Sequence, residues 1–297
     1  MNPGSRSGKG QRLWETWKSG LDLAGIEYEC VFTEEIGHAI ELARSAGSDV
    51  VVAIGGDGTI NEVLDGVIQS GNPDLKMGVL YSGTSPDFCR FHGIPIDTAE
   101  AVEALLSGRS RKVDVAEISY FDTLGQEVTA HFGCGCNIGM GASIARFANR
   151  WRKYLGDTLG TGLGVITTIA CNCRVDLDME IDGIKKHLIA VNNLTVAKNP
   201  YIASGLKLQI GLQADDGNLK IVGMHGRNKL GIFRLLPKYY SGSVTAVDGI
   251  YVQECRQVII SSERTQEIEF DGDPHGYLPV SIRILPKALT LLGGYYD

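Results

Sequence analysis

The sequence lacks the excess of positive charge on which most nucleic-acid-binding proteins depend. Its 297 residues include 28 Lys and Arg against 35 Asp and Glu, so the formal net charge is −7 at pH 7. A protein that binds a phosphate backbone normally presents a basic surface. We therefore expect no nucleic acid among the partners of this protein.

The sequence also lacks long apolar runs and a cysteine framework. No run approaches the roughly 20 apolar residues that a membrane-spanning helix needs, and no apolar leader follows Met1. The seven cysteines are an odd number and are scattered along the chain, so reduced thiols are expected. These absences favour a cytoplasmic protein that contacts membranes, if at all, only at their surface.

Alternating helix and strand patterns fill the first part of the chain. The apolar runs Val50–Ile54 and Met77–Leu80 predict buried strands, and Ile60–Ile68 between them predicts an amphipathic helix. Upstream, the alternation in Ile26–Phe32 predicts another strand, and Thr33 can cap the helix that follows. Repeated units of this kind predict an α/β domain with a parallel sheet.

The second part of the chain changes character, because most of its segments alternate with a period of two. These segments are Arg174–Ile181, Leu206–Ile210, Leu219–Val222, Gln257–Ile260 and Glu267–Phe270. They predict a mainly antiparallel β-sandwich, interrupted by helices at about Ala142–Leu155 and Lys229–Tyr240. We expect two domains, 1–115 and 116–285, with the last segment of about 286–297 able to return to the first.

The strongest motif is the Gly-Gly-Asp-Gly-Thr run of Gly55–Thr59, between a predicted strand and a predicted helix. Glycine lets the backbone approach phosphate oxygens, and the N–H groups at a helix N-terminus favour an anion. Asp57 cannot donate to a phosphate, so its useful roles are to hold Mg²⁺ or to orient a substrate hydroxyl. The alternative is a tight strand-to-helix turn without a ligand.

Two further polar loops have comparable positions. Asn2–Gly10 is rich in glycine and serine and includes Lys9, whereas Gly83–Arg90 follows the second predicted strand. Ligands of open α/β sheets bind outside the carboxyl ends of the strands, so we expect the three loops to converge on one crevice. A frayed chain terminus is the alternative reading of Asn2–Gly10.

Ordered motifs along nearly the whole chain resemble the catalytic domain of the diacylglycerol kinase family. They are an NPxSG-like start, GGDGTINE at Gly55–Glu62, GT-x-x-DF-x-R at Gly83–Arg90, Asp215–Gly217, Phe270–Asp273 and Ile284–Leu289. That family includes bacterial lipid kinases and sphingosine and ceramide kinases, and it is grouped with NAD kinases and phosphofructokinases. The resemblance implies an α/β nucleotide-binding domain followed by a lipid-binding β-sandwich domain, with the active site in the cleft between them.

The resemblance further implies an ATP-dependent kinase of a lipid hydroxyl, diacylglycerol- or sphingosine-like, with ATP and Mg²⁺ as cofactors. The implied nucleotide contacts are Asn2, Lys9, Thr33, Gly55, Gly56, Asp57, Gly58, Thr59, Ile60, Asn61 and Thr84. Asp87 and Arg90 would contact substrate or phosphate. The identity of the lipid stays open, and so does a homodimer.

The resemblance also implies the catalytic and metal-binding residues. Asp273 stands where the family usually has glutamate, and it would accept the proton of the lipid hydroxyl with Asp57 assisting. Asp216, with the backbone carbonyls of Gln213 and Asn218, matches a structural Mg²⁺ site of bacterial members.

Three departures from the family pattern bear on activity. The apolar strand that normally precedes the Asn-Pro element is absent, which should expose apolar surface on its neighbours. Ser85-Pro86 replace a glycine and an asparagine, and Tyr81-Ser82 stand where proline is usual. These departures indicate altered substrate handling or reduced catalysis.

Two other functions therefore remain open. A kinase of a soluble acceptor, as in NAD kinases, would share the GGDGT motif, although Glu62 and the GT-x-x-DF segment favour the lipid branch. A nucleotide- or lipid-binding protein without catalysis would account for the departures. One predicted helix is basic and aromatic, and it suits either a solvated face or docking on anionic lipid; its residues are Arg146, Phe147, Arg150, Trp151, Arg152 and Lys153.

Overall fold

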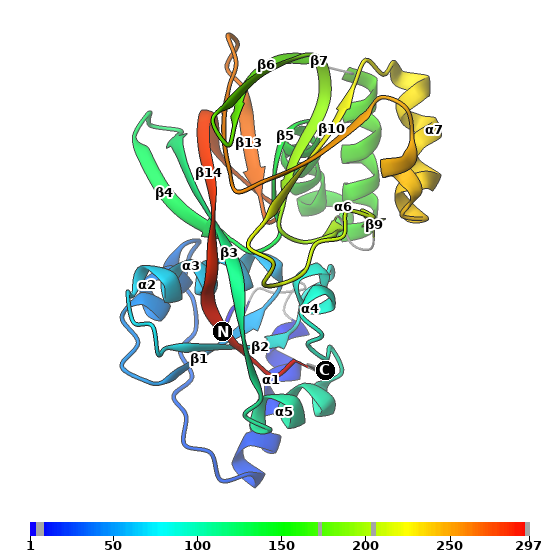
Figure 1. Ribbon diagram of the computed structural model, residues 1–297. Coiled ribbons are helices and arrows are strands. Elements are labelled where there is room, and N and C mark those ends of the chain that lie inside the picture. The colour runs from blue at the N-terminus through cyan, green and yellow to red at the C-terminus, as the bar shows by residue number, and fades with distance from the viewer. Residues whose placement is uncertain (4–8, 172–173, 203–205, 295–297) are drawn as a thin grey trace. The chain divides into compact units, whose positions relative to one another are not determined.

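The computed structural model describes residues 1–3, 9–171, 174–202 and 206–294 (Figure 1). Contacts within the chain divide it into two compact units. Unit 1 comprises Met1–Val115 and Pro286–Asp297, and unit 2 comprises Ala116–Leu285. The strands β3 (Ser110–Asp122) and β14 (Asp273–Leu292) contribute residues to both units.

Unit 1 has helices on both faces of parallel strands (Figure 1). Its other elements are α1 (Lys9–Leu23), α2 (His38–Arg44), β1 (Val50–Gly55), α3 (Asp57–Gln69), β2 (Lys76–Tyr81), α4 (Asp87–Phe91) and α5 (Thr98–Leu106). β1 pairs in parallel with β2, and Thr290 and Leu291 of β14 pair in parallel with the other edge of β2. Strands covered on both faces need apolar side chains on both, which explains their continuous apolar runs.

The core of unit 1 lies partly between α1, α5 and these strands. Trp14, Trp17 and Leu21 on one side of α1 pack with Ile54 of β1 and Leu80 of β2. Their spacing along α1 places the three side chains on one helical face. Burial of two tryptophans here removes a large apolar area from water and fixes α1 against the sheet.

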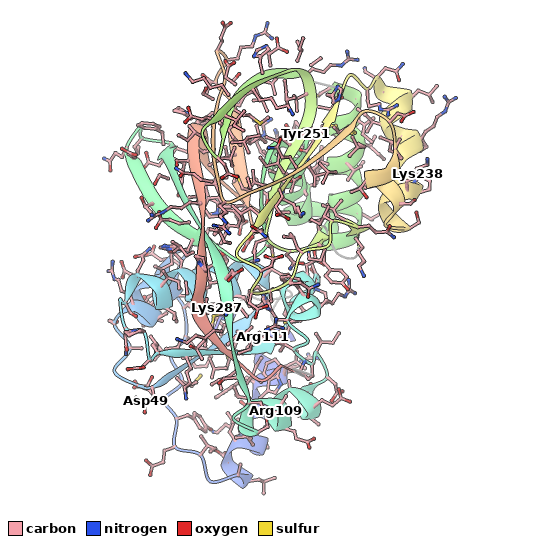
Figure 2. The ribbon with its side chains drawn as sticks, viewed as in Figure 1. Asp49, Arg109, Arg111, Lys238, Tyr251 and Lys287 are labelled. Carbon is pink, nitrogen blue, oxygen red and sulfur yellow. The ribbon has the colours of Figure 1, made fainter. Side chains whose placement is uncertain are left out.

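Two aspartates accept hydrogen bonds from backbone N–H groups in unit 1, one at the start of a helix and the other at a bend in a strand. The carboxylate of Asp97 accepts from the N–H groups of Ala99 (3.0 Å) and Glu100 (3.2 Å) and so caps α5. The carboxylate of Asp114 accepts from the N–H of Lys287 at 2.8 Å. Lys287 has a φ of 53°, so β14 bends at this residue and Asp114 satisfies the displaced N–H. Figure 2 labels Lys287 and, on the neighbouring β3, Arg111.

The predicted strand Ile26–Phe32 is wrong, because no strand forms there. Its apolar side chains are exposed, including Phe32 at 43%. The backbone of this segment instead meets the first residue of the chain: the amino group of Met1 donates to the Val31 carbonyl (2.7 Å), and the Thr33 N–H donates to the Met1 carbonyl (2.9 Å). On its other side, the N–H of Asn2 donates to the Ile54 carbonyl of β1 at 2.9 Å.

The predicted cap at Thr33 is also wrong. Helix α2 begins only at His38, after Gly37 with a φ of 86°. Its first N–H groups are satisfied by a distant residue, since the Glu62 carboxylate accepts from Gly37 (3.0 Å) and Ala39 (3.3 Å). A tertiary contact therefore replaces the local cap that the sequence predicted.

Unit 2 is built from antiparallel strands around one apolar core. Besides its parts of β3 and β14, its strands are β4 (Glu127–Phe132), β5 (Gly135–Gly139), β6 (Val175–Ile181), β7 (Ile184–Ala197), β8 (Tyr201–Ile202), β9 (Leu206–Lys207), β10 (Leu219–His225), β11 (Ile250–Cys255), β12 (Gln257–Ser261) and β13 (Glu267–Phe270). One run of neighbours is β14–β12–β6–β7–β10–β11, and β5 joins β7 to β13. Phe132, Leu177, Ile221 and Ile260 are among the fully buried core side chains.

The helices of unit 2 are α6 (Met140–Cys171) and α7 (Lys229–Tyr240), followed by a short 3₁₀ helix at Ser243–Ala246. The predicted bounds of α7 are confirmed. Helix α6 is longer than predicted, because helical structure resumes after a break at Gly156 (φ 73°, ψ 175°). Among the described residues, no helix combines the length and the apolarity needed to cross a bilayer.

Candidate active site

The Gly55–Thr59 motif forms the junction of β1 and α3. Gly56 is the N-cap of α3, and the first intrahelical bond runs from the Ile60 N–H to the Gly56 carbonyl (3.0 Å). The N–H groups of Gly58 and Thr59 precede that bond at the positive end of a 13-residue helix. Gly55 is required sterically, since a Cβ there would lie 2.5 Å from the Cβ of Thr59. The junction has the chemistry of an anion site.

The loop after β2 lies directly against this junction. The Ser82 N–H donates to the Gly55 carbonyl at 2.8 Å. A Cβ on Gly83 would lie 2.6 Å from the Cα of Gly56 and 2.6 Å from the hydroxyl oxygen of Tyr81. Two backbones can approach this closely only when both positions are glycine. The GGDGT and SGT loops are therefore in direct contact at the ends of neighbouring parallel strands.

Asp57 and Tyr81 form the polar pair within this junction. The Tyr81 hydroxyl donates to Oδ2 of Asp57 at 3.1 Å. Burial, and then the charge of Asp57, raise the pKa of Tyr81 well above its ordinary value. The phenol therefore stays protonated and holds the carboxylate in one orientation.

Asn2 joins the same group of residues. Its Nδ2 donates to Oγ1 of Thr59 at 3.1 Å, while its backbone is bonded to β1. Asn2, Gly55–Thr59 and Gly83 are thus brought together. Lys9 is the first residue of α1, but its side chain is outside the described part of the structure, as are Ser5, Ser7 and Gly8.

The remaining predicted nucleotide contacts have varied positions. The Ile60 side chain is 1% exposed and its N–H is used within α3, so Ile60 packs in the core. Asn61 is buried in the same helix, Thr33 is half-buried beside Met1, and Thr84 is exposed.

Asp87 and Arg90 lie on the short helix α4. Ser85 donates its hydroxyl to Oδ2 of Asp87 at 3.0 Å, and Nη1 of Arg90 lies 3.8 Å from Oδ1 of Asp87. Pro86 is the N-cap residue of α4. Ser85 thus takes part in holding the buried Asp87, whereas the Arg90 side chain is 43% exposed and can reach a ligand.

Asp273 lies at the end of a two-residue hairpin in unit 2. Phe270 of β13 pairs with Asp273 of β14, which leaves Asp271 and Gly272 as the turn. Both turn residues have positive φ, 48° and 100°, as a type I′ turn requires, and Asp-Gly suits that turn. Asp273 is exposed at this tip.

The Asp271 carboxylate holds the hairpin against a neighbouring loop. It accepts from three successive N–H groups, those of Gly133 (3.0 Å), Cys134 (3.0 Å) and Gly135 (2.9 Å). Burial raises the pKa of Asp271 to about 6, although the three N–H groups act in the opposite direction. Asp271 therefore positions the turn.

Glu269, which the sequence did not single out, is a buried acidic residue beside the Asp273 hairpin. It is 5% exposed and accepts from the Gly272 N–H (2.6 Å) and from Nδ2 of Asn137 (2.7 Å). Burial raises its pKa to about 7, and the neighbouring carboxylates of Asp271 and Asp273 add to this. The available signal was an acidic residue between two apolar ones in a predicted strand.

A part-buried chain of hydrogen bonds continues from Glu269 towards α6. Thr195 donates to Oδ1 of Asn137 (2.6 Å) and accepts from Nδ2 of Asn193 (3.1 Å), whose Oδ1 accepts from the Gly141 N–H (2.7 Å). The chain links the Asp273 hairpin to the first turn of α6. Hydrogen bonds joined in this way restrict the geometry of the residues they connect.

Comparison with known protein families gives a match for each of the two parts of the chain. Residues 1–118 match the family described as diacylglycerol kinase catalytic domain, and residues 135–293 match that described as YegS C-terminal NAD kinase beta sandwich-like domain. The chain belongs to the diacylglycerol kinase catalytic-domain family. The resemblance seen in the motifs is confirmed.

Individual relatives agree with this assignment to a kinase family. A diacylglycerol kinase of Staphylococcus aureus strain JH9 is 27% identical over 285 residues, which cover 91% of this chain and 84% of the relative. A Bacillus anthracis strain Sterne protein, solved as a candidate diacylglycerol kinase, superimposes with a TM-score of 0.76 at 21% identity, covering 99% and 95% of the two chains. Yeast NADH kinase, solved with NADH, has a TM-score of 0.51 at 12% identity, covering 95% and 78%. The structural likenesses show a shared fold.

In this diacylglycerol kinase family member, an ammonium group fills the position predicted for a structural Mg²⁺. Nζ of Lys198 lies 2.8 Å from the Gln213 carbonyl, 2.7 Å from Oδ1 of Asp216 and 3.3 Å from the Asn218 carbonyl. These are hydrogen-bond distances, whereas Mg²⁺ requires about 2.0–2.1 Å to each oxygen. The residues do not fit a metal at this position, because the ammonium occupies it.

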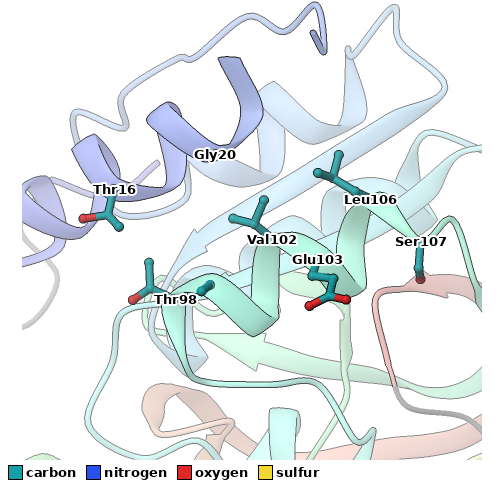
Figure 3. A pocket seen from close by; sticks show the side chains of 8 residues that line it. Thr16, Gly20, Thr98, Val102, Glu103, Leu106 and Ser107 are labelled. Carbon is teal, nitrogen blue, oxygen red and sulfur yellow. The ribbon is translucent and has the colours of Figure 1, made fainter. Parts of the chain in front are cut away.

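A hollow in unit 1 is separate from these groups. It has a volume of about 600 Å³ and lies between α1 and α5 (Figure 3). Figure 3 shows Thr16 and Gly20 on α1 facing Val102 and Leu106 on α5. Its lining carries little of the polar chemistry that binding a phosphate needs, in contrast to the GGDGT and SGT loops.

Proposed function

We propose that this protein transfers the γ-phosphoryl group of ATP to a hydroxyl group of a lipid. The observation that carries the proposal is the direct contact of the GGDGT and SGT loops at the N-terminus of α3, in a chain of the diacylglycerol kinase family. Backbone N–H groups at such a junction bind phosphate oxygens. The relative from Staphylococcus aureus is named a diacylglycerol kinase, which supports a lipid acceptor.

On this proposal, unit 1 binds the nucleotide. Gly55–Thr59 surrounds the phosphates, Gly83 lets the second loop approach them, and Asn2 holds Thr59 in place. Mg²⁺ accompanies ATP as its usual counterion and neutralises charge that develops on the transferred group. Asp57, held by Tyr81, is the carboxylate on this unit suited to orient that ion or the hydroxyl.

Asp273 is proposed as the acceptor of the hydroxyl proton. The hydroxyl oxygen forms the new bond to the γ-phosphorus, the bond from that phosphorus to the bridging oxygen breaks, and ADP leaves. The proton passes to a carboxylate oxygen of Asp273. Exposure of Asp273 and the three N–H bonds that fix the adjacent Asp271 support this role.

We also propose that α6 and α7 form the surface that meets an anionic membrane. The two helices share a small apolar cluster and have several large apolar side chains that are exposed, notably Phe233 (61%), Leu230 (56%) and Ile166 (62%). They carry seven Lys and Arg residues and a single acidic residue, Asp157, in a chain of net charge −7. Lys238 on α7 is one of the exposed cations (Figure 2). Exposed apolar groups beside basic ones suit a lipid surface.

The acceptor is tested by incubating the protein with γ-labelled ATP, Mg²⁺ and a panel of acceptors. Diacylglycerol, sphingosine and ceramide are presented in mixed micelles, and NAD and glycerol are presented in solution. A labelled lipid extracted into organic solvent supports the proposal and names the lipid. Label in NAD alone would transfer the assignment to a soluble acceptor, and label in none, with ATP bound, would indicate a protein without catalysis.

A further inference from the structure

Lys198 lies where β7 ends, and its side chain is 1% exposed. An ammonium group has three N–H donors and no acceptor. Among the described residues, the oxygens that accept from the Lys198 ammonium include the carbonyls of Gln213 (2.8 Å) and Asn218 (3.3 Å) and the carboxylate of Asp216 (2.7 Å). The buried ammonium therefore lies against oxygen acceptors, one of which carries a negative charge.

The Asp216 carboxylate supplies the charge that makes this burial tolerable. A buried cation without a counter-charge is strongly unfavourable, whereas one bonded to a carboxylate and carbonyls can be accommodated. The carboxylate also accepts from the N–H groups of Gln213 (2.8 Å) and Asn218 (3.0 Å). Burial acts to raise the pKa of Asp216, but these N–H groups and Lys198 outweigh it and lower the pKa.

A divalent ion would have to displace the ammonium to use the same oxygens. Mg²⁺ binds carboxylate and carbonyl oxygens with water completing its octahedral shell, so the oxygens of Gln213, Asp216 and Asn218 can serve an ion or the ammonium but not both at once. Two further positive charges beside the ammonium would repel it. Elsewhere in the described residues, no group of three or more His, Cys, Asp or Glu side chains is arranged to hold a metal.

We propose that Lys198 is a built-in cation that replaces a structural divalent ion in this family member. The ammonium fastens the loop of residues 211–218 to the end of β7, so the folding of this part of unit 2 needs no bound metal. The proposal concerns this cation site and stands apart from the identity of the phosphate acceptor.

Backbone hydrogen bonds connect the Lys198 site to the Asp273 hairpin. The N–H groups of Lys198 and Asn199 both donate to the Cys134 carbonyl, at 2.8 and 3.0 Å. The Cys134 N–H in turn donates to Oδ1 of Asp271 at 3.0 Å. The loop at Cys134, which holds the hairpin, is therefore bonded to the same end of β7 that the ammonium fastens. All of these contacts lie within unit 2.

The first test is metal content and thermal unfolding of the wild-type chain without nucleotide. After dialysis against 5 mM Mg²⁺ and gel filtration, elemental analysis should find no retained divalent ion. The midpoint Tm should be the same in EDTA as in Mg²⁺ or Ca²⁺. One retained equivalent of divalent ion that is lost in Asp216→Asn would overturn the proposal.

The second test is Lys198→Ala, which leaves the three oxygens facing a space without a cation. In EDTA its Tm should fall by roughly 10 °C, as expected for breaking a buried ion pair. Millimolar Mg²⁺ or Ca²⁺ should restore part of the loss, and the restoration should vanish in Lys198→Ala/Asp216→Asn. Terbium luminescence should report the new ion site in Lys198→Ala and none in the wild type.

Lys220→Ala is the matched control, because Lys220 also pairs with one carboxylate, that of Glu254 at 2.5 Å, nearer the surface. It should lower Tm by only about 1–2 °C and create no terbium site. Should Lys198→Ala fail to fold, Lys198→Met keeps the volume of the side chain without its charge, and its Tm in EDTA reports the loss of the cation. An unchanged Tm in both Lys198 variants, or equal terbium binding by the wild type, would contradict the proposal.

Discussion

At the scale of single residues, the site depends on acidic groups whose environments differ. Asp273 is exposed, Asp271 is held by three N–H groups, and Glu269 is buried beside them. Sequence motifs identified the first two but not Glu269. Motifs record residues that contact ligands, whereas Glu269 contacts Gly272 of its own hairpin and Asn137, which is 132 positions away in the sequence.

The buried Glu269 makes the stability of the fold depend on pH. Its pKa is about 7 in the folded chain against an ordinary value of 4.5. The folded state therefore binds this proton more strongly than the unfolded state, and the free energy of unfolding decreases as pH rises from about 4.5 to 7. Glu269→Gln should remove roughly 2–3 kcal/mol of that decrease. Urea unfolding at pH 5, 6, 7 and 8 measures it.

The exposed Glu127 of β4 provides the control for this measurement, since Glu127→Gln should retain the wild-type slope. A residual slope below about pH 6 is expected in Glu269→Gln, because the raised pKa of Asp271 remains. If Glu269→Gln and the wild type lost stability equally between pH 5 and 7, Glu269 would not be the group that titrates.

Gly83 allows a second prediction at the scale of residues. A Cβ at this position would lie 2.6 Å from the Cα of Gly56, so Gly83→Ala should force the two loops apart. The affinity for ATP, measured by calorimetry, should fall at least about tenfold, which corresponds to about 1.4 kcal/mol. Gly47→Ala is the control in the same unit, because an added Cβ there meets nothing within 4 Å. Equal ATP affinity in both variants would remove Gly83 from the nucleotide site.

At the scale of elements, sequence patterns predicted helices and strands correctly where the local sequence determines them. They failed where tertiary contacts determine the structure. The apolar runs at β1 and β2 and the bounds of α7 followed from periodicity. The strand predicted at Ile26–Phe32 failed, because alternation cannot say whether a neighbouring strand is present to pair with it. Helix α2 begins late because Glu62, a residue of another helix, supplies its cap.

Exposed apolar side chains of helix α7 are expected to contribute to membrane binding. Phe233→Ser and Leu230→Ser should each weaken sedimentation with phosphatidylglycerol vesicles roughly tenfold, because each removes an exposed apolar side chain that would enter the lipid. Leu124→Ser is the control, since Leu124 is 80% exposed on the turn between β3 and β4. Equal weakening by the control, or no vesicle binding by the wild type, would remove α7 from the membrane surface.

At the scale of the whole molecule, the ordered motifs were sufficient to predict the family, and comparison confirms it. They could not predict the Lys198 site, because two of its three oxygens are backbone carbonyls, which any residue supplies. The family resemblance implied a metal at Asp216 and the carbonyls of Gln213 and Asn218, and only the fold shows that a lysine from the end of β7 reaches the same point. The residue types at such a site do not reveal which groups meet there until the path of the chain is known.

The measurement that tests the central claim most directly is transfer of labelled phosphate to lipid by Asp273→Asn, with ATP affinity measured on the same samples. Asparagine keeps the shape of the side chain but cannot accept the proton, so kcat should fall by about 10²–10⁴ while ATP affinity stays within twofold. Asp178→Asn, at an exposed pair with His187 on the same unit, should retain wild-type kcat. Wild-type turnover in Asp273→Asn would contradict the assignment of Asp273 as the proton acceptor, and transfer to no lipid by the wild type would contradict the proposed function.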